Sequence, residues 1–362
     1  MMAVFTEVFE DVTKYGRKLQ TSEYKENGKY VIIDQGQKDI AGYTDETEGL
    51  FDDVPAIVFG DHTRVIKYVD KPCFLGADGV KLLRAKIDKP NYKYLFYALS
   101  NADIPNTGYN RHFKWLKEVE IPLPDEIEQK NIVNILEKVD ELISCRKEQL
   151  AKLDELVKAR FVEMFGDTIV NPFGWEKGSL GVVCDVRDGT HDSPQYHETG
   201  YPLVTSKNVT GGAIDLTDCS LIDETDYRKI NERSKVDMGD IIMPMIGTIG
   251  KPVIVNIEPN FAIKNVSLIK FKSDPKVSNI YIRTLLQSDY FDDAVLSKVR
   301  GGTQKFISLG DIRKLEILVP PMKLQNQFAA FVEQTEKTKA EVQKSLDELE
   351  ILKKSLMQKY FG

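Results

Sequence analysis

One long segment occurs twice in the sequence. Residues 121–166 align with residues 317–362 without a gap at a constant offset of 196 (317 minus 121), and both copies end in Phe-Gly. The identical aligned pairs are Ile121/Ile317, Pro124/Pro320, Gln129/Gln325, Glu137/Glu333, Leu150/Leu346, Leu153/Leu349, Leu156/Leu352, Lys158/Lys354, Phe165/Phe361 and Gly166/Gly362. The repeat predicts a duplicated architecture.

Each copy has apolar residues at alternating steps of four and three, which is the pattern of a heptad helix with one apolar seam. The predicted seam consists of Ile132, Leu136, Val139, Ile143, Leu150, Leu153, Val157 and Met164 in the first copy, and Phe328, Val332, Val342, Leu346, Leu349, Leu352 and Leu356 in the second. Polar residues interrupt it at Arg146, Thr335 and Lys339, so the second copy has the weaker pattern. A single stretch of this kind is also typical of an ordinary core helix. Two matched copies favour helices that pack against each other.

The start of the first helix carries a capping signal. Asp125 follows Pro124 and has Glu128 three residues later, as in a capping box. In the second copy Pro320 and Pro321 end the preceding secondary-structure element, and no capping side chain is evident. Each helix is expected to run for about 33 residues, or roughly 50 Å.

The two remaining segments have the composition of globular domains. The chain has 362 residues, of which 42% are hydrophobic, and this length accommodates two or three domains. Short strands are predicted at 30–33, 56–59, 201–205 and 239–243, and helices after Pro90 and at 280–299. We therefore expect globular domains at 1–120 and 167–316, and long helices at 121–166 and 317–362.

Charge and cysteine content limit the functional classes. The formal net charge of −7 argues modestly against nucleic-acid binding, although a local basic face can supply what the whole chain lacks. The four cysteines are scattered without metal-ligand spacing, which is typical of a reducing cytosol and not of a zinc site. Neither a signal peptide nor a membrane-spanning apolar segment is evident. A cytoplasmic protein without metal or other cofactor is expected.

Motifs for catalysis are missing from the sequence. Asn171-Pro172-Phe173 lacks the second proline of an adenine methyltransferase turn, and no glycine-rich turn for S-adenosylmethionine follows an early strand. The phosphate-loop and nucleophile-elbow patterns are also absent. The acidic residues after Pro124 are explained by helix capping. The polar loop at 187–194 is expected to be a turn, with a nucleic-acid contact left open.

Several polar loops carry side chains that suit phosphates and base edges, although such side chains also suit any solvated loop. The two clearest segments, 106–112 and 300–305, precede the two long helices. The candidate DNA-binding residues are Gln37, Lys38, Arg64, Tyr109, Asn110, Arg111, Arg187, Thr190, His191, Lys207, Asn208, Arg300, Thr303, Gln304 and Lys305.

Over its whole length the chain resembles the DNA-specificity subunits of type I restriction-modification systems. The resemblance rests on the segments that begin the two repeats at 121–132 and 319–328, the Phe-Gly endings, and Asp-Gly-Thr-His at 188–191. It implies an α+β fold with two target recognition domains, separated by two antiparallel coiled-coil helices around a pseudo-two-fold axis. It also implies a non-catalytic subunit that binds double-stranded DNA, two methyltransferase (modification) subunits and two restriction (motor-nuclease) subunits.

Two other functional classes are compatible with parts of the sequence. A coiled-coil adaptor that assembles proteins without binding DNA would show the same helices. A stand-alone methylating or cutting enzyme is disfavoured by the missing motifs. Salt-dependent duplex binding distinguishes the specificity subunit from the adaptor, because neutralising phosphates releases counterions.

Overall fold

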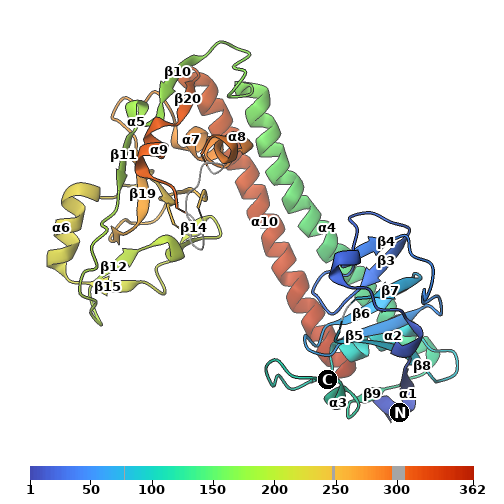
Figure 1. Cartoon of the computed structure of the whole chain (residues 1–362). Coiled ribbons are helices and arrows are strands. Elements are labelled where there is room, and N and C mark those ends of the chain that lie inside the picture. The colour runs from blue at the N-terminus through green and yellow to red at the C-terminus, as the bar shows by residue number, and fades with distance from the viewer. Residues whose placement is uncertain (77, 247–248, 296–305) are drawn as a thin grey trace. The chain divides into compact units, whose positions relative to one another are not determined.

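The computed structural model describes residues 1–76, 78–246, 249–295 and 306–362 (Figure 1). Two compact units are present: unit 1 comprises 1–148 and 343–362, and unit 2 comprises 149–342. The boundary passes through two helices of 40 residues each, α4 (Glu126–Phe165) and α10 (Met322–Phe361). Each unit therefore contains the beginning of one long helix and the end of the other.

Unit 1 contains three small sheets. The four-stranded antiparallel sheet has the order β2 (Phe9–Asp11), β8 (Val80–Ala85), β5 (Ala56–Gly60), β6 (Ile66–Val69). The three-stranded sheet has the order β4 (Gly42–Thr44), β3 (Tyr30–Ile33), β7 (Cys73–Leu75), with β3 and β7 parallel. The third sheet pairs β1 (Met2–Val4) with β9 (Glu120–Pro122). Strand β5 is buried throughout because it lies inside its sheet, which explains its continuous apolar sequence.

Unit 2 repeats these three sheets in the same order and with the same strand directions. The four-stranded sheet has the order β11 (Asp185–Asp188), β19 (Val266–Lys270), β16 (Ile241–Pro244), β17 (Val253–Ile254). The three-stranded sheet has the order β15 (Ser220–Ile222), β12 (Tyr201–Val204), β18 (Ala262–Ile263), with β12 and β18 parallel. The third sheet pairs β10 (Glu176–Ser179) with β20 (Glu316–Val319). The duplication thus extends beyond the helices into both globular parts.

The short helices follow the same duplication. Unit 1 contains α1 (Phe5–Val8), α2 (Tyr92–Ser100), α3 (Phe113–Leu116), and the 3-10 turns η1 (Thr13–Tyr15) and η2 (Thr21–Glu23). The matching helices of unit 2 are α5 (Leu180–Val183), α7 (Asn279–Leu285) and α9 (Leu309–Lys314). Unit 2 also contains η3 (Ser206–Asn208), the hairpin β13 (Val209–Thr210) and β14 (Ala213–Ile214), α6 (Glu224–Ser234) and α8 (Asp289–Ala294). Among the described elements these additions distinguish the two units.

The sequence predicted one helix where the structure has two. The expected helix at 280–299 is divided into α7 and α8, and residues 296–299 lie outside the described part. The division allows Leu285, Leu286 and Phe291 to enter one core, because a turn between the helices redirects the chain. Ser288 is the N-cap residue of α8, and Asp289 and Asp292 lie in its first turn, where acidic side chains favour a helix start.

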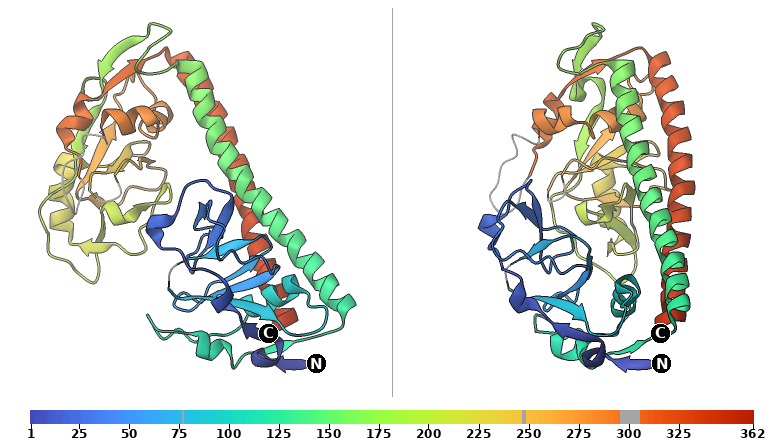
Figure 2. Two further views of the ribbon diagram at one scale, coloured as in Figure 1. Left: turned by 45° about the vertical axis from the view of Figure 1, so that its right-hand side comes forward. Right: turned by 90° about the vertical axis from the view of Figure 1, so that its right-hand side faces the viewer.

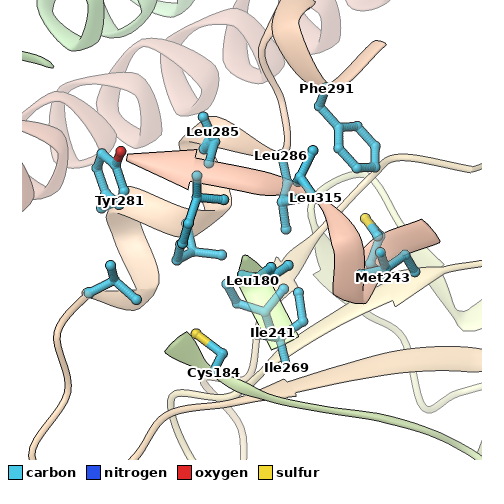
Figure 3. Close-up of a cluster of buried hydrophobic side chains, with 14 of the residues drawn as sticks. Leu180, Cys184, Ile241, Met243, Ile269, Tyr281, Leu285, Leu286, Phe291 and Leu315 are labelled. Atoms are coloured by element: carbon cyan, nitrogen blue, oxygen red, sulfur yellow. The ribbon is translucent and has the colours of Figure 1, made fainter. Parts of the chain in front are cut away.

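The ends of the long helices are part of the cores of the units. In unit 2, residues of α5, β16, β19, α7 and α8 form the cluster shown in Figure 3, and Phe161 and Phe165 of α4 and Phe328 of α10 belong to it. In unit 1, the corresponding core includes Leu136 from the start of α4 and Met357 from the end of α10. The helices are therefore anchored by burial of apolar surface at both ends.

Helices α4 and α10 run antiparallel and side by side within each unit (Figures 1 and 2). In unit 1, Asp140 pairs with Lys353 and Lys147 pairs with Glu350. In unit 2, Lys339 Nζ lies 2.6 Å from Asp154 Oδ1. The pairs show that sequence number rises along one helix as it falls along the other.

The long helices exceed the predicted 33 residues, since each has 40. Helix α4 begins after Asp125, whose Oδ1 accepts a hydrogen bond from the Glu128 backbone N–H at 2.8 Å, so this cap is confirmed. It ends at Phe165, and the following Gly166 adopts a φ of +79°, the left-handed conformation that glycine favours after a helix.

Candidate nucleic-acid interface

Three turns of unit 1 meet at Gln35, which follows β3. The Gln35 backbone carbonyl accepts a hydrogen bond from Thr63 Oγ1 at 2.6 Å, and its Oε1 accepts one from the His62 backbone N–H at 3.2 Å. Its Nε2 donates to the Asp78 carbonyl at 3.1 Å. The β3–β4, β5–β6 and β7–β8 connections are thereby held together. Gly79 has a φ of +86°, which favours glycine, and a Cβ there would lie 2.7 Å from the Gln35 amide and displace it.

The α2–α3 loop joins this group through His112 and Asp61, which are both buried. The His112 backbone N–H donates to the Asp61 carbonyl at 2.8 Å, and His112 Nδ1 lies 3.0 Å from the same oxygen. Because a carbonyl only accepts hydrogen bonds, Nδ1 must carry a proton. Asp61 Oδ1 accepts a further bond from the Phe113 backbone N–H at 2.7 Å. The loop therefore ends against the β5–β6 turn.

Tyr109 is the outermost aromatic residue of this loop, with 87% of its surface exposed. Its ring stacks on that of His62, with centroids 4.7 Å apart and planes inclined by 10°. His62 Nδ1 lies 3.2 Å from the Asn110 carbonyl. The Asn110 side chain in turn donates to the Thr107 carbonyl. The loop tip is thus ordered by contacts to its own backbone and to the neighbouring turn.

The structure brings the six candidate residues of unit 1 to one end of its sheets. Gln37 and Lys38 are exposed after β3, and Tyr109, Asn110 and Arg111 are exposed in the α2–α3 loop. Arg64 lies in the β5–β6 turn with a φ of 62°, and its Nη1 donates to the Ile104 carbonyl at 2.9 Å. Among the described residues, the Arg111 side chain has no hydrogen-bond or ion-pair partner.

In unit 2, a buried carboxylate organises the loop that contains Thr190 and His191. Asp188 Oδ2 lies 2.9 Å from His191 Nε2, and its other oxygen accepts a hydrogen bond from Arg233 of α6. His191 Nδ1 lies 2.9 Å from Asn265 Oδ1. The hydrogen bonds to Asn265 and Asp188 raise the pKa of His191, because both acceptors favour the charged imidazolium.

This loop borders a pocket of about 420 Å³. The pocket is lined by residues 190–194 and, from α6, by Asp226, Lys229 and Arg233. The pocket therefore combines basic and acidic side chains around His191. Because α6 belongs only to unit 2 among the described elements, the two units present different surfaces.

The turns at this end of unit 2 are equivalent to those of unit 1. Thr190 pairs with Lys264, which follows β18, and the Lys264 backbone N–H donates to the Val204 carbonyl at the end of β12. Lys207 follows β12, as Lys38 follows β3, and its side chain is exposed. Thr190, His191 and Lys207 thus share one end of unit 2.

Two candidates of unit 2 have structural partners that account for them. The Asn208 side chain is buried, since only 6% of the residue is exposed. Its Oδ1 accepts from the Thr205 backbone N–H and Oγ1, and its Nδ2 donates to the Asp218 carbonyl, so it holds its own loop. Arg187 binds Asp185 and the Arg233 carbonyl. These internal contacts explain both residues, and their predicted DNA contacts stay predictions.

The remaining candidates, Arg300, Thr303, Gln304 and Lys305, lie outside the described residues. His62, Arg233 and Asn265 were not identified from the sequence. His62 lies in a polar turn directly after an apolar strand, and this pattern could have identified it as a candidate from the sequence. Arg233 and Asn265 become recognisable only through their contacts with Asp188 and His191.

The predicted seam residues differ in burial along α4 and α10. Ile132, Leu136, Val139, Phe328, Val332 and Leu346 are buried, whereas Ile143, Leu150, Leu153, Val342 and Leu349 are partly buried. Leu352 was assigned to the seam, but 46% of it is exposed and Lys353 takes the inward position through its bond to Asp140. The polar seam residues find partners: Arg146 Nε donates to Ser345 Oγ at 3.2 Å, and Thr335 Oγ1 donates to the Phe331 carbonyl.

Within the described ranges, no group of three or more His, Cys, Asp or Glu side chains is arranged to hold a metal ion. No described helix is long and apolar enough to cross a bilayer.

The chain is similar to known proteins over most of its length. The family model described as type I restriction modification DNA specificity domain matches residues 5–155 and 172–351. The MjaVIII specificity subunit of a type I restriction enzyme from Methanocaldococcus jannaschii is 26% identical over 315 residues, covering 78% of this chain and 74% of that protein.

Two solved structures resemble the fold. The S subunit of a type I restriction-modification system from M. genitalium aligns with 100% of this chain and 96% of that one, with a TM-score of 0.56 and 18% identity. A second structure, described as concerning complex assembly and conformational transition of the type I R-M system, aligns with 100% of this chain and 97% of that one. Its TM-score is 0.58 and its identity is 19%.

Proposed function

The chain belongs to the type I restriction modification DNA specificity family, and we propose that it reads a bipartite, asymmetric DNA target. Members with this role are non-catalytic parts of a restriction-modification complex. In this proposal residues 1–120 and 167–316 are the two target recognition domains, and each reads one half-site. Residues 121–166 and 317–362 provide the helices that connect them.

The observation that carries the proposal is the repeated sheet topology of the two units. In both units the described candidate residues lie at the same end of the sheets, and Lys38 and Lys207 follow the equivalent strands β3 and β12. This end of each unit therefore offers its loops to a ligand. The loops themselves differ, and α6 and the β13–β14 hairpin are additions in unit 2. Similar scaffolds with different loops favour two half-sites of different sequence, because side chains at base edges determine specificity.

The long helices supply a reason for a fixed gap between half-sites. Within each unit α4 and α10 pair antiparallel, and their ends are anchored in the apolar cores. We propose that this pair keeps the two recognition domains at a constant separation, so that the DNA between half-sites is not read. Half-site spacing is determined in the same way in other two-fold DNA-binding proteins.

We further propose that two methyltransferase subunits and two restriction subunits bind this chain. The internal repeat supports a pair of equivalent partners, because each unit presents the start of one repeat and the end of the other. The similarity to a structure concerned with assembly of a type I R-M system supports the same class of partner.

Exchange of one recognition domain tests the proposal. Residues 167–316 are replaced by the equivalent segment of a family member with another target, chosen to retain a tyrosine at the position of Tyr281, which packs on Phe165. The sites methylated by the chain with its methyltransferase partner are then mapped. One half of the target should change and the other half should remain.

A reciprocal exchange of residues 1–120 provides the matched control and should alter the opposite half. A change in both halves, or in neither, would contradict separate reading. The absence of salt-dependent duplex binding would instead favour the adaptor function, because phosphate contacts release counterions and an adaptor makes none.

A further inference from the structure

We propose that Tyr109 stacks on a nucleobase that has been displaced from the duplex stack, and that His62 is the positioning residue for this contact. The inference rests on the proposed DNA-reading function of unit 1. It adds a specific mode of contact, stacking on an opened base step, to the general assignment of this loop.

The first observation is the unusual exposure of Tyr109. Its exposed fraction of 87% exceeds that of other exposed aromatic residues such as Tyr15 at 56% and Tyr196 at 52%. One face of the ring lies on His62, and the opposite face and the hydroxyl edge are open. A flat aromatic surface presented in this way is suited to a second flat partner, since offset stacking is favourable for aromatic rings.

The second observation is that the ring is positioned before any ligand arrives. His62 is held by its ring contact to the Asn110 carbonyl and by its backbone bond to Gln35 Oε1. The loop end is held by His112 on Asp61. Ordering the tyrosine in advance lowers the conformational entropy lost on binding, which is how rigid aromatic contacts gain affinity.

The surroundings favour a nucleobase over an apolar protein partner. Tyr109 is flanked by Gly108 and Asn110, and Arg111 is exposed beside them. An apolar protein surface would require further apolar residues, whereas the loop from Asn106 to Arg111 has none besides Tyr109. Aromatic stacking on a base combined with nearby cationic side chains is the usual arrangement for nucleic-acid contacts of this kind.

The consequence concerns the DNA. The faces of bases in a regular duplex are covered by their neighbours, so Tyr109 can stack only where a base step opens or a base leaves the helix. Proteins that insert side chains between steps or extrude bases compensate the unstacking cost with new contacts. In this proposal the open face of Tyr109 provides that compensation within the half-site read by unit 1.

The test uses the assembled methyltransferase complex and a duplex of its mapped target, with 2-aminopurine placed at successive positions of the unit 1 half-site. Apart from the methylated base, the wild-type complex should raise the fluorescence at one position, because a base stacked on the Tyr109 ring alone is quenched less than a base between two neighbours. Tyr109→Ala should remove the increase and weaken binding by roughly 5- to 150-fold, the range expected for losing one base–aromatic stack. Tyr109→Phe should retain both properties.

The His62 variants test whether its ring positions Tyr109. His62→Ala should reduce the fluorescence increase and raise Kd, whereas His62→Phe should retain much of the signal because it preserves the stacking surface. The salt dependence of binding should stay unchanged in Tyr109→Ala, since no charge is removed. Tyr15→Ala, which removes an exposed tyrosine from η1, serves as the control and should behave like wild type.

The proposal is overturned if the wild-type complex methylates its target specifically but brightens no probe position apart from the methylated base. Wild-type affinity of Tyr109→Ala would overturn it as well. If the wild-type complex shows no sequence-specific methylation, the proposed function of the chain fails instead, so the two failures are distinguishable.

Discussion

Phe165, the last residue of α4, packs edge-on against Tyr281 of α7, with ring centroids 4.9 Å apart. The corresponding contact in unit 1 joins Phe361, the last residue of α10, to Tyr94 of α2 at 5.3 Å. Phe165 and Phe361 end the two copies of the sequence repeat. The Phe-Gly endings are therefore explained by packing: each closes the core of the unit that contains the end of its helix.

Removing the hydroxyl of either tyrosine should destabilise its unit by a similar amount. Tyr94 donates to the Pro122 carbonyl at 2.8 Å, and Tyr281 donates to the Leu318 carbonyl at 3.0 Å. Tyr94→Phe and Tyr281→Phe should each lower the free energy of unfolding by about 1 kcal/mol, the value of one hydrogen bond. Denaturant unfolding measures the change, with Tyr15→Phe as an exposed control. A large difference between the two would contradict their equivalence.

Two leucines six residues apart on α10 should differ strongly in their importance. Leu346 has 5% of its surface exposed and Leu352 has 46%. Leu346→Ala should cost about 2–4 kcal/mol through lost burial and a residual cavity. Leu352→Ala should cost about 0.5 kcal/mol or less, as at other surface sites. Thermal or chemical denaturation gives both values, and equal losses would show that Leu352 belongs to the seam after all.

Arg111→Ala should weaken duplex binding, because this exposed guanidinium lies among the candidate reading residues of unit 1. The loss should be about 1–3 kcal/mol for a base contact, and smaller with a shallower salt slope for a phosphate contact. Arg84→Ala is the matched control, since Arg84 lies near the far end of β8 and pairs with Glu10 and Asp53. Duplex titrations of wild type and Arg111→Ala at several salt concentrations measure the change. If the two proteins bind with equal affinity at every salt concentration, Arg111 does not contact DNA.

DNA binding through unit 2 should weaken as pH rises. The raised pKa of His191 means that its imidazolium is favoured, so any stabilisation from this charge is complete below the ordinary value of about 6.5 and is lost as pH rises through the raised value. The charged groups around it are Asp188 of β11, Asp192 of its own loop, and Asp226, Lys229 and Arg233 of α6.

The measurement compares duplex affinity across this pH range for wild type and His191→Gln. The variant keeps polar atoms but carries no charge, so its affinity should depend less on pH. His197→Gln, altered in the same connection, should retain the wild-type profile. Identical profiles for wild type and His191→Gln would exclude a role for this imidazolium.

Lengthening both long helices together should lengthen the unread DNA spacer. Register is maintained by Arg146–Ser345 in unit 1 and by Lys339–Asp154 in unit 2, so an insertion in α4 alone would displace one set of partners. Inserting four residues after Glu148 and four after Val342 should lengthen the helix pair by about 6 Å, which corresponds to one or two base pairs of DNA. Four residues are close to one turn, which roughly preserves the inward faces.

Mapping methylated sites before and after the paired insertion provides the readout. Both half-sites should stay the same, because neither reading surface is altered. The single insertion in α4 is the control and should impair assembly. An active complex with an unchanged spacer would show that contacts other than these helices set the distance.

The sequence alone determined the features that depend on local patterns. The repeat, the heptad seams, the cap at Asp125, and the strands β3 and β5 follow from periodicity and short-range preferences, which residues express wherever they lie. The family resemblance followed from the same segments. The loops that carry the candidate residues could also be located, because polar residues follow apolar strands at similar places in both halves.

Only the tertiary structure decided which of those residues are available and what holds them. Asn208 looked like its exposed neighbours until its burial and three hydrogen-bond contacts were seen, and Leu352 matched the seam until Lys353 took the inward position. Gln35 and His62 acquire their roles from turns far apart in sequence. Likewise, Phe165 and Phe361 reach their tyrosines only after the chain has folded back. Such contacts depend on the packing of distant segments, and no local pattern encodes them.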